Sequence, residues 1–75
     1  GEDRMEALEE GSAVARAIAA LPPRYRELLL LKHWQGYSDR EIAALLGMAQ
    51  GNVARTLQRA KEKLRKALKD EGVEV

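Results

Sequence analysis

Apolar residues recur every three or four positions in four successive segments of the chain, which is the spacing of one face of an α-helix. In the first segment these residues are Val14, Ala17, Ile18 and Leu21. Ser12 is a suitable N-cap for this segment, and Pro22-Pro23 ends it because proline cannot continue the helical hydrogen-bond ladder. The pattern therefore predicts a first helix from residue 13 to residue 21.

The second segment predicts a helix from about Pro23 to Gln35. Tyr25, Leu28, Leu29 and Lys32 form one stripe along it, with Leu31 and Trp34 beside that stripe. A face of this width is typical of a central helix that contacts neighbours on more than one side. Gly36 is expected to end the helix in the left-handed conformation, and Tyr37 is expected to fold back onto the core.

Two further helices are predicted on either side of a single glycine. Ser38-Asp39-Arg40-Glu41 has the pattern of a capping box, in which the first and last side chains each bond the other residue's amide. The short helix that follows contains Ile42, Ala43, Leu45 and Leu46, and Gly47 ends it. The last helix is predicted from near Gln50 to roughly Lys69. Its inner face consists of Val53, Leu57, Ala60, Leu64 and Leu68.

A short helix, a glycine turn and a longer helix are the parts of a helix-turn-helix motif. A helix of about two turns is too short to be stable alone. Val53 and Leu57 are therefore expected to pack back across the Gly47 turn and hold it. The predicted fold is an all-α, four-helix domain over residues 13–71, with a C-terminal helix-turn-helix and no β-wing. Residues 1–12 are predicted to be an acidic linker or a frayed helix, and residues 72–75 a tail.

The composition narrows the possible chemistry. The chain has 75 residues, no cysteine and a single histidine, His33, so neither a metal site nor any other cofactor is expected. Both serines, Ser12 and Ser38, precede predicted helices, where capping explains them. We therefore expect no enzyme and no small-molecule substrate. No segment approaches the roughly 18 apolar residues of a membrane span, and none resembles a signal peptide, so we expect no membrane partner.

Charge is distributed unevenly along the chain, although the net charge is only +1. Residues 1–12 carry five acids and one base, whereas residues 50–69 carry seven bases and one acid. A basic second half indicates a polyanionic partner, although a solvated surface helix is the simpler alternative.

The outward face of the last helix has side chains suited to reading DNA. Its polar members are Gln50, Asn52, Arg55, Thr56 and Arg59. Gln and Asn can pair with adenine and Arg with guanine in the major groove. Because residues near the start of a recognition helix reach the bases, we assign Gln50 and Arg55 to bases, and Arg59 with Arg40 to phosphates. Gly51 keeps the approach to the groove open, and Ala49 leaves the helix start weakly capped.

The stretch ALPPRYRELLLLKHWQGYSDREIAALLGMAQGNVARTLQRAKEKLRKAL resembles region 4 of bacterial sigma-70 family factors, especially those of the extracytoplasmic-function (ECF) group. The most specific matches are Leu21-Pro22-Pro23-Arg24, the run from Glu41-Ile42-Ala43 to Leu46-Gly47, and Val53, Leu57, Ala60 and Lys61 at their spacing. One departure is Ala54-Arg55-Thr56, where many members have Lys-Ser-Arg.

The resemblance implies that the last helix binds the −35 element of double-stranded promoter DNA in transcription initiation. It also implies that the first helices dock on the flap-tip helix of the RNA polymerase β subunit, or on an anti-sigma factor, in the bacterial cytoplasm. The residues expected at that docking surface are Ile18, Leu21, Leu30 and Trp34.

Two other classes of protein fit part of the pattern. The DNA-binding domain of LuxR-type regulators also has four helices and a similar Glu-Ile-Ala, Leu-Gly and Val run. The double proline, the Ala60-Lys61 pair and the upstream helix favour the sigma factor. A helical protein-interaction module without DNA binding could use Leu30 and Trp34 to line a groove for a partner helix.

Overall fold

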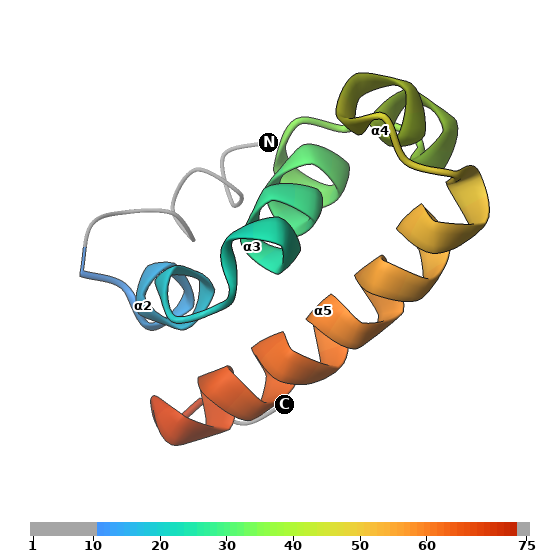
Figure 1. The fold of residues 1–75 in the computed structure, drawn as a ribbon. Helices are drawn as coiled ribbons and strands as arrows, with labels where there is room; N and C mark the ends of the chain where they lie inside the picture. Colours follow the sequence, from blue (N-terminus) through green and yellow to red (C-terminus); the bar gives the residue numbers. More distant parts are fainter. Residues whose placement is uncertain (1–10, 74–75) are drawn as a thin grey trace.

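The computed structural model describes residues 11–73, which form four α-helices and one π-helical turn (Figure 1). The elements in chain order are α2 (Ala13–Ala19), α3 (Pro23–Leu29), the π-helical turn η1 (Leu30–Trp34), α4 (Asp39–Leu46) and α5 (Gln50–Asp70). The described residues contain no β-strand, and the predicted all-α fold is confirmed. An acidic linker or frayed helix was predicted for residues 1–12, and residues 1–10 of this segment lie outside the described residues.

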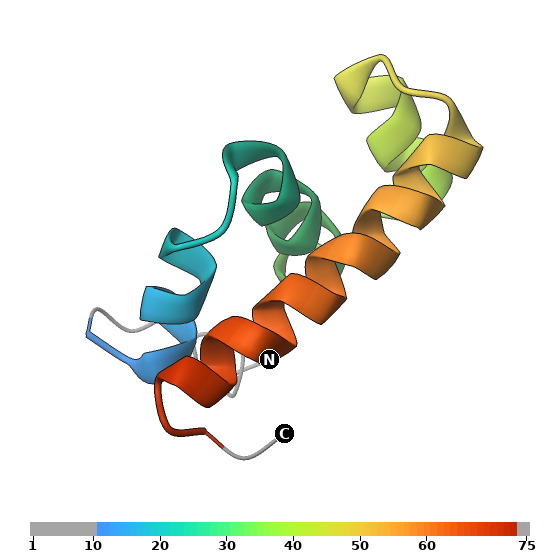
Figure 2. The same ribbon diagram turned by 60° about the horizontal axis from the view of Figure 1, so that its bottom comes forward.

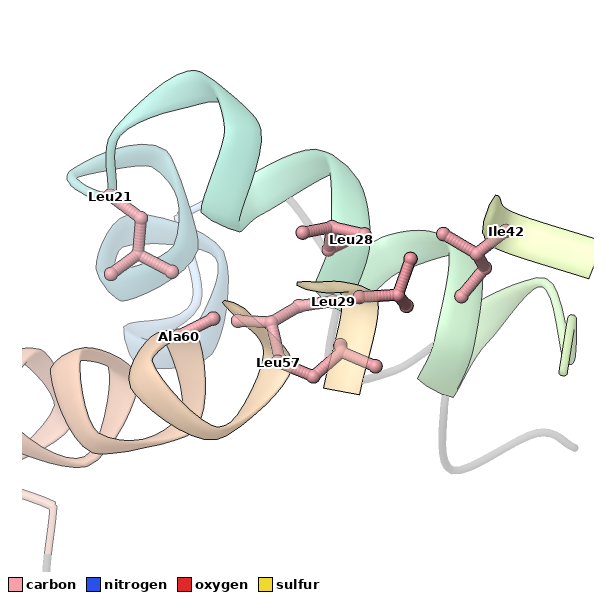
Figure 3. Close-up of a cluster of buried hydrophobic side chains, with 7 residues drawn as sticks. Leu21, Leu28, Leu29, Ile42, Leu57 and Ala60 are labelled. Carbon is pink, nitrogen blue, oxygen red and sulfur yellow. The ribbon is translucent and has the colours of Figure 1, made fainter. Parts of the chain in front are cut away.

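The long helix α5 is the element against which the other three α-helices pack. Figures 1 and 2 show α2 beside the C-terminal part of α5, α3 beside its middle and α4 beside its N-terminal end. The buried cluster that joins them consists of Leu21, Leu28, Leu29, Ile42, Val53, Leu57 and Ala60. In Figure 3, Leu29 and Leu57 lie between α3 and α5, with Leu21 at one end of the cluster and Ile42 at the other. The helix predicted between Pro23 and Gln35 does contact more than one neighbour, since α3 packs against α5 and its continuation η1 contacts α4.

The ends of α2 and α3 follow the local sequence signals. The Ala15 N–H donates to the Ser12 side-chain oxygen at 3.0 Å, so Ser12 caps α2 as predicted. Pro23 occupies the first turn of α3, where the missing amide hydrogen costs nothing. The Arg16 Nε lies 2.6 Å from Glu71 Oε1 and so joins α2 to the end of α5. Because both side chains are partly exposed, this ion pair contributes little to stability.

The π-helical turn is the main departure from the predicted secondary structure. The sequence predicted one uninterrupted α-helix to about Gln35, but the Gln35 N–H donates to the Leu30 carbonyl, five residues back, at 2.9 Å. This wider turn changes the direction of the side chains that follow it. The run of leucines before it is equally compatible with both kinds of helix, so the apolar periodicity does not reveal the change.

The chain leaves this turn through Gly36, whose φ of +79° confirms the predicted left-handed conformation. The Tyr37 N–H donates to the Leu31 carbonyl at 2.9 Å. The expectation that the Tyr37 side chain folds onto the core is wrong, because this side chain is 39% exposed. Only its backbone amide returns to the helix.

Helix α4 buries only some of its four apolar residues Ile42, Ala43, Leu45 and Leu46. Ile42 is fully buried, and Ala43 and Leu46 are partly buried against the core. Leu45 is 60% exposed. It is turned about 100° from Leu46 around the helix axis, on the flank that no other element covers. Leu45 therefore does not belong to the packed face of α4.

Leu28→Ala should lower the free energy of unfolding by about 2–5 kcal/mol, because it leaves a cavity at a fully buried position. Leu45→Ala is the matched control and should change the free energy by no more than about 0.5 kcal/mol, since Leu45 is exposed. Urea denaturation followed by far-ultraviolet circular dichroism measures both. Equal losses in the two variants would contradict the packing described here.

Candidate nucleic-acid interface

Helix α4 begins with a complete capping box. The Glu41 N–H donates to the Ser38 Oγ at 3.1 Å, and the Ser38 N–H donates to Glu41 Oε1 at 2.9 Å. The hydrogen bond from the Ser38 backbone, and then that from its side chain, hold the pKa of Glu41 below its usual range. The Lys32 Nζ lies 2.9 Å from Asp39 Oδ1 and links η1 to the first turn of α4. The start of the helix-turn-helix is thus determined by local bonds and by one ion pair to the preceding element.

The turn between α4 and α5 is short and depends on Gly47. Gly47 has a φ of +67°, and both its N–H and that of Met48 donate to the Ala43 carbonyl. A left-handed residue at this point favours glycine because it has no Cβ. Ala49 returns the chain to an extended conformation, and α5 begins at Gln50.

Packing of α5 against α4 and α3 determines which face of α5 is exposed. Val53 is fully buried and Leu57 is 5% exposed, and both belong to the cluster that contains Ile42. The predicted packing across the Gly47 turn is therefore confirmed. With these residues turned inward, the opposite face of the first turns of α5 is directed towards solvent.

The structure brings most of the predicted DNA-binding residues to that exposed face. The predicted residues of α5 that are exposed are Gln50, Gly51, Asn52, Arg55 and Arg59. At 3.6 residues per turn, Arg55 and Arg59 lie opposite the buried residues, whereas Gln50 lies on the side of Leu57, at the exposed helix start. Thr56 is half-buried and lies at the edge of this face. Arg40 is exposed on α4. No atom lies within 4 Å of the position that a Cβ would take at Gly51, so the approach to the helix start is open.

The start of α5 has no side-chain cap, as predicted from Ala49. The N–H groups of Asn52 and Val53 donate to the Ala49 carbonyl at 3.0 and 3.1 Å. The amides before them, at the very start of the helix, lie where the helix dipole places partial positive charge. This end of α5 therefore favours an anionic partner.

Two features of this face were not predicted from the sequence. The Arg55 Nη2 donates to Asn52 Oδ1 at 2.6 Å, so two of the expected DNA-binding residues bond to each other. Arg24, in the first turn of α3, places its Nη1 3.6 Å from the Met48 sulfur and adds a cation beside the turn. The first contact has a helical spacing of three residues that could have indicated it. The second joins residues far apart in the chain and has no local signal.

The residues expected to contact the polymerase lie in two different environments. Ile18 and Leu21 are only 4% and 6% exposed and belong to the core, so the expectation that they offer side chains to a partner is wrong. Leu21 packs in the same buried cluster as Leu57 and Ala60 of α5. Leu30 and Trp34, at the two ends of η1, are half-buried and keep part of their surface accessible.

The remaining basic surface lies along the second half of α5. The exposed cations there are Lys61, Lys63, Arg65, Lys66 and Lys69. Two shallow depressions of about 290 and 250 Å³ share Lys63 and Lys66 in their walls, and Tyr25 lines the larger one. Between residues 11 and 73 there is no group of three or more metal-ligating side chains. Within the same range, no helix is long and apolar enough to cross a membrane.

Comparison with known proteins gives a consistent result. Residues 12–64 match the family model described as sigma-70, region 4. The chain is 39% identical over 67 residues to an RNA polymerase sigma-E factor of Streptomyces antibioticus, covering 89% of this chain and 37% of that protein. It is 35% identical over 69 residues to the ECF RNA polymerase sigma factor SigW of Bacillus subtilis, covering 92% and 37%. It is also 36% identical over 66 residues to SigM of Mycobacterium tuberculosis, covering 88% and 34%.

The chain thus spans little more than a third of the length of these relatives. No solved structure matches it. The resemblance to the ECF group, drawn from the double proline and the helix-turn-helix residues, is confirmed by these matches.

Because of the capping box, the Tm of the domain should fall at acidic pH. Because the folded chain lowers the pKa of Glu41, this residue stabilises the fold fully above its unfolded pKa. That contribution is lost as the pH falls through the lower, folded pKa. Glu41→Gln keeps an acceptor but does not titrate, so its Tm should fall less on acidification than that of the parent chain. Parallel Tm curves for the two proteins across the acid range would contradict the assignment.

Proposed function

The chain belongs to the sigma-70 region 4 family, and from this premise we propose that it recognises the −35 element of a promoter for an ECF sigma factor while docked on RNA polymerase. The observation that carries the proposal is the division of α5 into two faces. Val53, Leu57 and Ala60 are buried, while the polar side chains of the first turns are exposed opposite them. A helix held in this way presents its outer face to a major groove.

The exposed side chains have the chemistry that promoter DNA requires. Gln50 and Arg55 lie in the first two turns of α5 and are assigned to base edges. Arg59 and Arg40 flank them and are assigned to phosphates. Arg24 lies beside the turn through its contact with Met48 and adds a further cation near the expected path of the DNA backbone.

Docking on the polymerase uses a different element of the domain, the π-helical turn η1. Leu30 and Trp34 are the partly accessible apolar residues of η1. They are the side chains through which a flap-tip helix of the β subunit would bind, and an anti-sigma factor would compete for the same surface. The relatives are named RNA polymerase sigma factors, which supports a polymerase partner and therefore action in the bacterial cytoplasm.

Affinity for DNA should depend steeply on salt, because phosphate contacts release bound counterions. With about four neutralised phosphates, the slope of log K against log salt concentration should be about −3.6. Arg59→Ala should reduce the steepness by about 0.9, whereas Lys69→Ala, near the far end of α5, should leave it unchanged. Fluorescence anisotropy with a labelled −35 duplex at several salt concentrations measures the slopes. An affinity of the parent chain that does not change with salt concentration would contradict the proposed phosphate contacts.

Polymerase docking should appear as chemical-shift changes in an NMR titration of the labelled domain with a β-flap-tip helix peptide. We expect the changes to cluster between residues 14 and 34, and Trp34→Ala to weaken binding about tenfold or more, as an aromatic at the centre of an interface does. Leu45→Ala, which alters an exposed leucine of α4, is the matched control.

Each other result of this titration has a definite meaning. If the peptide moves nothing while −35 DNA still shifts Gln50 to Arg59, the domain is a free-standing regulator of transcription. If neither ligand binds, the domain is a helical interaction module and the proposed function is wrong.

A further inference from the structure

The bond between Asn52 and Arg55 joins two side chains on the exposed face of α5. The Arg55 Nη2 donates to Asn52 Oδ1 at 2.6 Å, and both residues are exposed. The two residues are three positions apart, so their side chains are neighbours on the helix surface. None of the ion pairs formed by the described residues involves Arg55, so this bond is the contact that orients its guanidinium.

Two further features favour the same orientation of Arg55. Side chains of an α-helix lean towards its N-terminus, which carries Arg55 over Asn52 and towards the start of α5. Arg59 lies four positions further on, where the repulsion between like charges also directs Arg55 away from it. The guanidinium is thereby held near the end of the helix that reaches base edges.

We propose that Asn52 is a positioning residue for Arg55, and that the pair rather than Arg55 alone determines a preference for guanine in the DNA. This inference rests on the proposed function. The guanidinium has five N–H donors, and the bond to Asn52 uses one of them. The four that remain are enough for the bidentate pair with O6 and N7 of guanine. Holding a long side chain in place before binding reduces the conformational entropy lost in the complex.

The same bond argues against Asn52 as an independent reader of adenine. A bidentate pair between an asparagine and adenine uses the amide oxygen and the amide nitrogen together. The Oδ1 of Asn52 already accepts from Arg55, and although one lone pair remains, this bond orients the amide towards Arg55 and not towards a base edge. Substitution of Asn52 should therefore alter the base preference at the position that Arg55 reads, and at no second position.

The test is a selection of randomised double-stranded DNA by the 75-residue chain and four variants, followed by sequencing of the bound fraction. The parent chain should enrich guanine at one position, and Arg55→Ala should abolish that enrichment. Asn52→Ala should reduce it about three- to tenfold, the factor expected when one hydrogen bond is lost. Lys69→Ala, in the last turn of α5 and outside the proposed DNA contacts, is the control and should leave this guanine preference intact. Circular dichroism checks that all variants fold alike.

Asn52→Asp separates positioning from a general effect on affinity. The carboxylate keeps an acceptor for Arg55 but adds negative charge beside the DNA. We expect it to weaken binding to all sequences alike while retaining the guanine enrichment that Asn52→Ala loses.

The outcomes distinguish this inference from the proposed function. If the parent chain enriches no sequence at all, promoter recognition fails and the inference fails with it. If the parent chain has a clear preference that Asn52→Ala leaves unchanged, the positioning role is wrong while promoter recognition stands. A change of preference at a second position in Asn52→Ala would also overturn it, since Asn52 would then read a base itself.

Discussion

Burial of one face of α5 is the constraint on which the rest of the structure depends. Val53 and Ala60 have no exposed surface, and α2, α3 and α4 all pack against the helix that carries them. A chain of 75 residues buries only about 60% of the surface that it exposes when unfolded, so it has room for one such shared core. The same rotation that turns these residues inward turns Arg55 and Arg59 outward. In the proposed function, the buried face of this 21-residue helix stabilises the fold and its exposed face recognises DNA.

Local bonds determine the ends of the short helix α4, and long-range packing determines its position. Eight residues are too few for a helix that is stable alone. The Ser38–Glu41 capping box satisfies amides at one end, and Gly47 supplies the left-handed turn at the other. These local signals determine where α4 begins and ends. Its position relative to α5 comes from Ile42, whose complete burial anchors it in the core.

The two functional surfaces of the domain lie on different elements and have different chemistry. The start of α5 is polar and basic, whereas η1 offers the partly accessible apolar residues Leu30 and Trp34. The ion pair between Lys32 and Asp39 joins η1 to the first turn of α4, between the two surfaces. In the proposed function, this arrangement would let one small domain bind DNA and a protein partner at the same time, because the two surfaces are made of different residues.

The sequence by itself determined the four helices, the Ser38 and Gly47 boundaries of α4, the inward face of α5 and the family. Each of these depends on residues within a few positions of one another, where spacing and capping chemistry act directly. Only the tertiary structure decided that Ile18 and Leu21 are buried while Leu45 is exposed, because periodicity shows which face is apolar but not whether another element covers it. It also placed Arg24 beside Met48, a contact between residues too far apart in the chain for any local pattern to indicate.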